Sequence, residues 1–291
     1  MPWGNNGNFT STTYIETPAQ QPQVKNALIE EITGVTCPNC PSAHVILENL
    51  ITSTGGRVIG VSYHVGAGSG WLSQDAPAPA SSQNMTSADA QTITSSALFY
   101  PSNSGGQSGF PGFAPGGAVD RIIHSNAGPT GDVSAWDLVT NWGGYVTTQL
   151  ADTTPVNIYI SPNYSASGAI RQISINIGLH YTRTQTDSDK LSIYLTEDSI
   201  VTSQQLANGA IDTYYVHQHI MRAAVTNPLG NVINVPSFVA GRVDSLAFVY
   251  VIPPADSVWN AKHMNVVAIV QKYQNGQNAV LQSCIAQIFP H

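Results

Sequence analysis

The sequence predicts an α/β domain followed by an all-β domain, and three observations lead to this fold class. The motif Cys37-Pro38-Asn39-Cys40 lies between a strand-like apolar run and a helix-like stretch. From about residue 154 the apolar residues alternate with polar ones at a period of two, which is typical of half-buried strands. The length of 291 residues suits two domains of ordinary size.

The composition favours a protein that works outside the cytoplasm. Only 9% of the residues are charged, against roughly a quarter in typical soluble domains. Cytosolic enzymes stay soluble through mixed surface charge, and this chain has little. Its 10 basic and 17 acidic residues are scattered, so there is no basic stripe and nucleic acid is not an expected partner. No run of about 18 apolar residues exists, so no transmembrane segment is predicted.

Residues 1–24 form a polar N-terminal extension. They lack the basic start and apolar centre of a secretory signal, and we interpret the sequence as a mature form in preference to a protein that is not exported. Residues 8–15 could form a short strand. An extension without a core of its own is ordered only when it packs on its own domain or on a neighbouring copy.

Residues 25–65 predict a βαβ unit. An apolar strand precedes the Cys motif, a helix follows it, Gly55-Gly56 stops the helix, and a second strand runs over 58–65. Cys37 would then sit at a helix N-terminus, where exposed backbone N–H groups favour a thiolate. This is the local arrangement of a thioredoxin-type site, so we predict a thioredoxin-like domain over 25–151.

The rest of that domain contains a long insertion and a proline-led strand. Residues 66–112 are rich in Gly, Ser, Ala and Pro, with one short helix expected within 87–98. Pro115 precedes a strand that ends near Ile123, and thioredoxin-type folds place a cis-proline there. A helix over about 133–150 closes the domain.

Residues 152–291 predict an antiparallel β-sandwich. Ile173, Ile175, Ile177 and Leu179 alternate with polar residues, and about seven such segments are separated by turn signals. The domain boundary is expected near residue 151.

From about residue 25 the chain resembles the 28-kDa outer-membrane-protein family, which are surface proteins of Gram-negative bacteria. The likeness is carried by the segments 31–44, 115–121, 195–200 and 215–222. The resemblance implies a thioredoxin-like domain joined to a β-rich domain and a location at the outer membrane. It does not cover the extension or the Gly/Ser-rich insertion, and it implies no defined activity.

The Cys pair has two main interpretations. In the redox interpretation Cys37 is the nucleophile, Cys40 the resolving thiol and Pro115 packs against them. Thr36 stands where redox-active thioredoxins usually carry Trp, and no Lys lies near the pair in sequence. A structural or relic disulfide is therefore the favoured interpretation. Glu30 or Glu31 could act as a buried proton acceptor, although a solvated strand end is the favoured interpretation for both.

Metal sites are weaker hypotheses, and no cofactor is predicted. Cys37, Cys40 and His44 offer three ligands for a structural zinc ion, with His64 as a fourth. Covalent haem attachment is excluded, because Pro41 stands where it needs His. His217 and His219 would project from one face of a strand, and a third ligand would have to be His180, Asp212 or Glu197. A polar strand face or an interface is the favoured interpretation of this pair. Cys284 is expected to be a buried small hydrophobe.

Two functions follow from these features. The first is a non-catalytic extracytoplasmic protein at the bacterial surface, binding or assembling with copies of itself or with other cell-surface proteins. Peripheral association with the outer membrane is expected for it. The alternative is an exported thiol–disulfide oxidoreductase that uses Cys37, Cys40 and Pro115.

Overall fold

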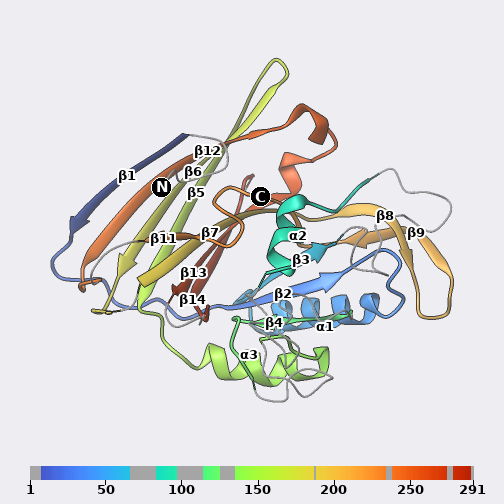
Figure 1. Ribbon diagram of the computed structural model, residues 1–291, viewed down its shortest axis with the longest axis horizontal. Coiled ribbons are helices and arrows are strands. Elements are labelled where there is room, and N and C mark those ends of the chain that lie inside the picture. The colour runs from blue at the N-terminus through green and yellow to red at the C-terminus, as the bar shows by residue number, and fades with distance from the viewer. Residues whose placement is uncertain are drawn as a thin grey trace. The chain divides into compact units, whose positions relative to one another are not determined.

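The computed structural model describes residues 8–65, 83–96, 114–124, 135–186, 188–233, 238–273 and 278–289. The fold is mostly β and contains several sheets (Figure 1). The chain divides into two compact units. Unit 1 comprises Met1–Asn26, Leu150–Glu197 and Ala224–His291, and unit 2 comprises Ala27–Gln149 and Asp198–Ala223.

Unit 1 contains an antiparallel four-stranded sheet in the order β1-β12-β6-β5. Its strands are β1 (Asn8–Ile15), β5 (Val156–Ser167), β6 (Ile170–Tyr181) and β12 (Arg242–Ile252). The predicted alternation in β6 is confirmed, because Ile173, Ile175 and Leu179 are fully buried. The far end of the β5–β6 hairpin extends beyond the other strands of its sheet (Figure 1).

The second sheet of unit 1 has β13 between β7 and β14, and β11 pairs with the other edge of β7. These strands are β7 (Ser188–Glu197), β11 (Asn231–Ile233), β13 (Met264–Tyr273) and β14 (Val280–Gln287). The first eight residues of β13 are all buried, and residues 266–270 at its centre are all apolar. Strand β5 of the first sheet lies against β13 and β14.

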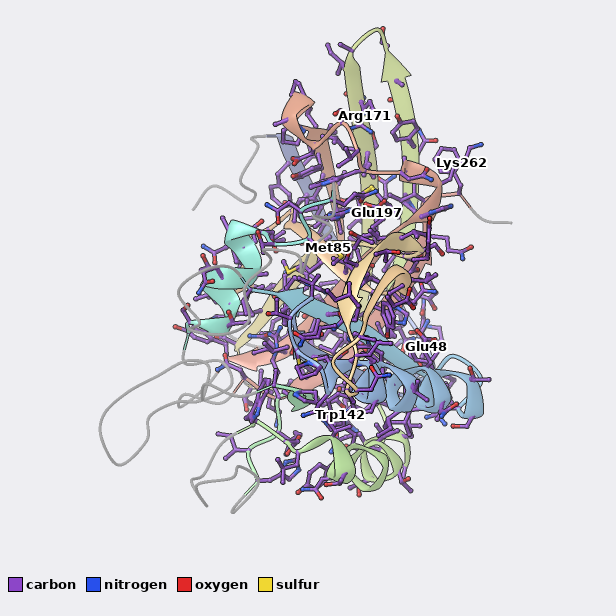
Figure 2. All side chains as sticks on the ribbon, turned by 90° about the vertical axis from the view of Figure 1, so that its right-hand side faces the viewer. Glu48, Met85, Trp142, Arg171, Glu197 and Lys262 are labelled. Carbon is purple, nitrogen blue, oxygen red and sulfur yellow. A yellow bond between two sulfur atoms is a disulfide. The ribbon has the colours of Figure 1, made fainter. Side chains whose placement is uncertain are left out.

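Short 3-10 helices follow β12 in unit 1. They are η2 (Pro254–Asp256) and η3 (Ala261–His263). The guanidinium of Arg171, labelled in Figure 2, donates hydrogen bonds to the carbonyls of Asp256 and Trp259. These bonds attach the segment to the start of β6.

The N-terminal extension packs on its own chain. Strand β1 pairs with β12 over its full length, from Asn8 opposite Val249 to Ile15 opposite Arg242. Further along, the backbone N–H of Gln23 donates to the side chain of Asn157 on β5. Of the two partners expected for the extension, the structure shows its own domain.

Unit 2 is built around β2, which pairs with β3 in parallel and with β4 in antiparallel orientation. Strand β10 joins the free side of β3, also in parallel. The elements are β2 (Ala27–Thr33), α1 (Cys40–Ser53), β3 (Val58–His64), α2 (Ala88–Thr94), β4 (Gly116–Val119), η1 (Val139–Asn141), α3 (Trp142–Leu150), β8 (Ile200–Gln205), β9 (Ile211–His217) and β10 (Ile220–Ala224).

Several sequence predictions for unit 2 are confirmed with changed boundaries. The βαβ unit is present as β2, α1 and β3. The short helix α2 begins after Ser87, whose hydroxyl accepts a hydrogen bond from the N–H of Ala90. Helix α3 starts later than predicted, because Asp137 is extended and forms a β-bridge with Gly117. Most of the Gly/Ser-rich insertion lies outside the described residues.

The division of the chain differs from the uninterrupted second domain expected over 152–291. Residues 198–223 belong to the compact unit that contains 27–149. The reason is local pairing and packing. Strands β8 and β9 form a hairpin whose residues contact the Cys motif, and β10 pairs with β3 at Ile220 and Ser62. Sequence patterns report strands but not the sheet that each strand joins.

Candidate functional site

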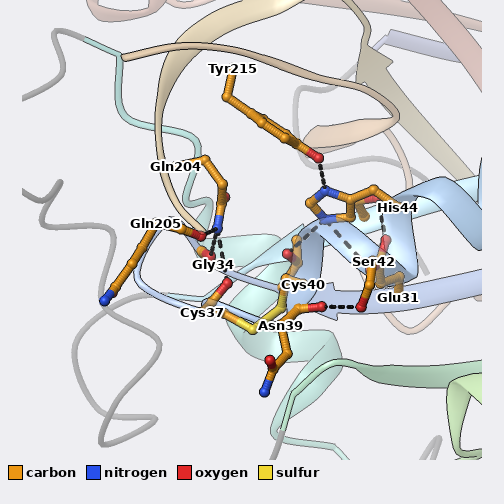
Figure 3. Close-up of a disulfide and its surroundings, with 12 residues drawn as sticks. Glu31, Gly34, Cys37, Asn39, Cys40, Ser42, His44, Gln204, Gln205 and Tyr215 are labelled. Atoms are coloured by element: carbon orange, nitrogen blue, oxygen red, sulfur yellow. Dashed lines mark hydrogen bonds and ion pairs between the residues drawn. A yellow bond between two sulfur atoms is a disulfide. The ribbon is translucent and has the colours of Figure 1, made fainter. Parts of the chain in front are cut away.

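Cys37 and Cys40 form a disulfide in a tight turn that opens α1 (Figure 3). Their Cα atoms are 5.4 Å apart. Asn39 is the N-cap residue and the helix begins at Cys40, so the motif has the strand–turn–helix setting that the sequence predicts. The two residues are 1% and 0% exposed. The disulfide is therefore shielded from solvent.

Strand β8 covers the Cys turn. The side-chain amide of Gln204 donates hydrogen bonds to the carbonyls of Gly34, at 3.3 Å, and of Cys37, at 3.0 Å (Figure 3). The backbone N–H of Gln205 donates to the carbonyl of Val35 at 2.8 Å. The side chain of Val35 is buried in a cluster with Met85, Ile200 and Ile220. The covering strand is thus held by both polar and apolar contacts.

Pro115 lies at the end of β2 from which the Cys turn departs. The Ala114–Pro115 peptide bond is cis, as the sequence predicts. The next residue, Gly116, pairs with Ile32 near the end of β2. This register puts the proline and the disulfide near the same end of β2.

Glu30 is buried in β2 and fully paired, which corrects the expectation of a solvated strand end. Its side chain is completely inaccessible. It accepts hydrogen bonds from Arg121 Nε at 2.6 Å and Nη2 at 2.5 Å, and from the Tyr63 hydroxyl at 2.5 Å. A bidentate guanidinium–carboxylate pair of this kind is a strong buried interaction.

Glu31 is equally buried but poorly paired, so the solvated interpretation is wrong for it too. Oε2 accepts a hydrogen bond of 3.3 Å from the Ser62 hydroxyl. Oε1 has no hydrogen bond, and His44 Nε2 lies 3.6 Å from it. Burial raises the pKa of Glu31 to about 8, and Ser62 and His219 offset this only in part. The group is a neutral carboxylic acid at pH 7.

His44 projects from α1 above Glu31 (Figure 3). Its Nδ1 shares a hydrogen bond of 2.7 Å with the hydroxyl of Tyr215, and its Nε2 one of 3.0 Å with Thr33 Oγ1. The pKa of His44 is lowered to about 3, mainly by burial and in part by the nearby His217 and His219. His44 is therefore neutral at neutral pH.

His217 ends β9 inside a group of aromatic rings. Its ring centroid is 4.8 Å from that of Tyr215, 5.5 Å from that of His64 and 6.5 Å from that of His44. Burial lowers its pKa to about 4, although backbone groups of Ser203 and Thr202 and the charge of Asp212 oppose the shift. This residue is a neutral part of the core.

His219 does not share the surroundings of His217, contrary to the expected i and i+2 arrangement. Strand β9 ends at His217, and His219 has a φ of 60°, which reorients the chain. Its Nε2 is 2.9 Å from Glu48 Oε1, and its Nδ1 is 3.3 Å from Asp198 Oδ1. Burial alone would lower the pKa of His219, but the two carboxylates raise it to about 9. It is an imidazolium at neutral pH.

The structure does not gather the metal ligands considered from sequence. Among the described residues, no group of three or more His, Cys, Asp or Glu is arranged to hold a metal ion. His180 Nδ1 is 3.0 Å from Glu16 Oε1, and the Glu197 side chain accepts a hydrogen bond from the backbone N–H of Asn260. Asp212 accepts one from the N–H of Tyr214. Cys284 is a free, partly exposed thiol in β14, and burial raises its pKa.

A pocket of about 370 Å³ opens between α1 and β9 within unit 2. It is lined by Glu31, His44, Val45, Leu47, Glu48, Asn49, Ser62, Tyr215, Val216, Gln218 and His219. Sequence reasoning missed this pocket. The only signal was the likeness of segments 31–44 and 215–222 to one family, and those two segments supply most of its lining.

Comparison with known proteins gives one family match. The family model of outer membrane protein Omp28 matches residues 112–288. No functionally curated protein sequence matches the chain. Among the described residues, no helix is long and apolar enough to cross a membrane.

One solved structure shows the same fold at low sequence identity. HBP35 of Porphyromonas gingivalis superposes with a TM-score of 0.62 at 16% identity, covering 91% of this chain and 75% of that one. A structural-genomics protein from Agrobacterium tumefaciens gives a TM-score of 0.49 at 14% identity, covering 92% and 97% of the two chains. The first of these supports the fold only.

Proposed function

Because the chain belongs to the Omp28 outer-membrane-protein family, and is accordingly an outer-membrane or extracytoplasmic protein, we propose that it acts at the cell surface by binding or self-assembly and carries out no thiol chemistry. In this proposal the Cys37–Cys40 disulfide is structural. Its partners are copies of itself or other cell-surface proteins, and its association with the outer membrane is peripheral.

The burial of the disulfide carries the proposal. Thiol–disulfide exchange requires a thiolate to reach a sulfur atom, and both cysteines are inaccessible. Gln204 and Gln205 of β8 hydrogen-bond to the backbone of the Cys turn. A partner thiolate would have to displace this strand before it could attack either sulfur atom.

Strand β1 supports a role in assembly. It forms one edge of its sheet, because its only strand partner among the described residues is β12. Its sequence, NFTSTTYI, carries no charge and no proline, which are two of the features that natural edge strands use to prevent pairing with other chains. An exposed edge of this kind accepts a strand from a second molecule.

The finer fold assignment is also part of the proposal. A thioredoxin-like core is supported by the order β3-β2-β4, by α1 starting at the Cys motif and by the cis Pro115. A β-sandwich is supported by the contact of β5 with β13 and β14.

The disulfide proposal is tested by alkylation and mass measurement of the native protein across a series of redox buffers. A structural disulfide stays closed down to potentials below about −300 mV. Reduction between about −120 and −270 mV, the range of catalytic pairs, would overturn it.

The assembly proposal is tested by sedimentation of the wild type and the edge variant Thr12→Lys across a range of concentrations. We expect concentration-dependent association in the wild type and its loss in the variant, because a lysine on the edge opposes strand pairing. Thr92→Lys on the exposed face of α2 adds the same charge elsewhere and should not change the association. A wild type that stays monomeric at millimolar concentration would contradict assembly.

The second candidate function is an exported thiol–disulfide oxidoreductase. It is favoured by the location of Cys37 ahead of α1 and by the cis-proline near the same end of β2. An insulin-reduction assay of the wild type and Cys37→Ser decides it. Activity that disappears in the variant would establish this function in place of the first.

A further inference from the structure

The pocket between α1 and β9 is a built cavity with a polar floor and an apolar rim. Val45 and Val216 stand on the rim and are 59% and 47% exposed. Buried Leu47 also lines it. Below them, Ser62 and Glu31 come from the central strands β3 and β2. Its volume of about 370 Å³ is in the range of small-ligand sites.

The charges around this pocket are predominantly negative. Glu48 lines it from α1 (Figure 2), and its side chain is 45% exposed. Asp198 lies on the other side of His219. The single imidazolium of His219 is shared by these two carboxylates, so two acidic side chains flank one cationic side chain. His44 is neutral and adds no positive charge.

The pairing of Glu31 gives independent support for a binding site here. It is fully buried, it lines the pocket, and its Oε1 has no hydrogen bond. Buried carboxyl oxygens are rarely left without a partner, because the loss costs on the order of 1–3 kcal/mol. An arrangement that keeps such a group beside a cavity is typical of a binding site.

We propose that this pocket binds a primary ammonium group carried on an alkyl chain, as in a lysyl side chain or a small aliphatic amine. Glu48 pairs with the ammonium group, and Val45, Leu47 and Val216 contact the alkyl stem. Amphipathic stems of this kind bury their methylene groups along apolar surface while the charged end keeps a polar partner. The formal charge of the chain, −7, also favours a cationic partner.

Binding is coupled to the ionisation of Glu31. The groups that face Glu31 are Ser62 from β3, Glu48 and His44 from α1, and Tyr215 and His219 from the β9 segment. In the free protein the pKa of Glu31 is raised to about 8, first by burial. A cation in the pocket favours the carboxylate form. Amine binding below pH 8 therefore releases a proton, and the affinity rises with pH up to that value.

The test is isothermal titration of the full chain with n-butylamine and with Nα-acetyl-lysine methylamide at pH 6, 7 and 8. Buffers of different ionisation enthalpy report the protons released. We expect a dissociation constant on the order of 1 mM for a ligand of this size, several-fold weaker binding at pH 6 than at pH 8, and a proton release near pH 7. The alcohol n-butanol and Nα-acetyl-norleucine methylamide keep the stem and lack the charge, and neither should bind.

Two variants separate the roles of the carboxylates. Glu31→Gln is isosteric with the protonated acid, so it should fold, bind about tenfold more weakly and release no proton. Glu48→Gln should weaken binding while proton release remains. Tighter binding of the lysine derivative than of n-butylamine identifies a lysyl side chain as the ligand, and equal binding identifies a small amine.

The proposal is overturned if the uncharged analogues bind as well as the amines, or if Glu31→Gln leaves both the affinity and its pH dependence unchanged. Absence of saturation at 50 mM amine (on the order of fifty times the expected constant) would also overturn it. The inference rests on the binding role proposed above, but the tests are separate. A failed amine titration leaves the redox-buffer result for the disulfide intact, and a reducible disulfide leaves the amine result intact.

Discussion

Glu30 and Glu31 are neighbours on one strand and are equally buried, yet their surroundings differ in kind. Glu30 accepts three hydrogen bonds of 2.5–2.6 Å from Arg121 and Tyr63. Glu31 accepts one of 3.3 Å and has an oxygen without any. Successive side chains on a strand point to opposite faces, so one face of β2 holds a closed ion pair and the other an open site. Burial by itself therefore does not distinguish these two carboxylates, whereas the completeness of their hydrogen bonding does.

The largest loss of stability is expected on the face of β2 that holds the Glu30–Arg121 ion pair. Glu30→Gln removes the charge that compensates Arg121, and breaking one side of a buried pair costs about 3–5 kcal/mol. Urea denaturation at pH 7 measures the loss in the free energy of unfolding. The same substitution at the next position, Glu31→Gln, is the matched control and should cost far less. Equal losses in the two variants would remove the distinction between the faces.

The next effect concerns pH. The folded-state pKa of Glu31, about 8, lies above its ordinary value of 4.5. Between these values the folded state holds a proton that the unfolded chain has lost, so the contribution of Glu31 to stability falls as the pH rises. Relative to the wild type, Glu31→Gln should gain roughly 2–4 kcal/mol between pH 5 and pH 8. Parallel stability curves for the two proteins would show that Glu31 is not held as a neutral acid.

The third effect concerns the Cys37–Cys40 disulfide, which follows β2 in the chain. The disulfide closes a loop with a sequence separation of 3, and a loop this short restricts the unfolded chain little. Replacing both cysteines by serine should lower the free energy of unfolding by about 2 kcal/mol, less than Glu30→Gln. Denaturation of the double variant under the same conditions checks the order. A larger loss than at Glu30 would contradict it.

The smallest effect is expected at the covering strand. Gln204→Ala removes the amide that donates to the carbonyls of Gly34 and Cys37, at a cost of about 1 kcal/mol. The Gln204→Ala variant should also be reduced faster by a small thiol. Alkylation of the released cysteines measures the rate of reduction. Gln205→Ala is the control, because Gln205 contributes its backbone N–H. Identical reduction rates in both variants would mean that β8 does not shield the sulfurs.

Local patterns alone supported several features. The alternation in β6 and the strand–turn–helix setting of Cys37 and Cys40 were predicted from neighbouring residues, and the structure contains them. The cis bond before Pro115 was predicted from the arrangement of thioredoxin-type folds, and it is also present. The likeness to an outer-membrane family, and with it the location, also came from short segments of sequence. These features depend on interactions within a few residues, which is the range that periodicity and motifs describe.

Three features depend on tertiary structure: the burial of the disulfide, the different pairing of Glu30 and Glu31, and the pocket. Strand β8 lies more than 160 residues beyond Cys37 in the chain, as the Gln204–Cys37 hydrogen bond shows. Arg121 reaches Glu30 from 91 residues away and Tyr215 reaches His44 from 171 away. The exposure and pKa of an acid or an imidazole depend on every group packed around it. The sequence alone gives the identity of each side chain, but it does not show which distant residues surround that side chain.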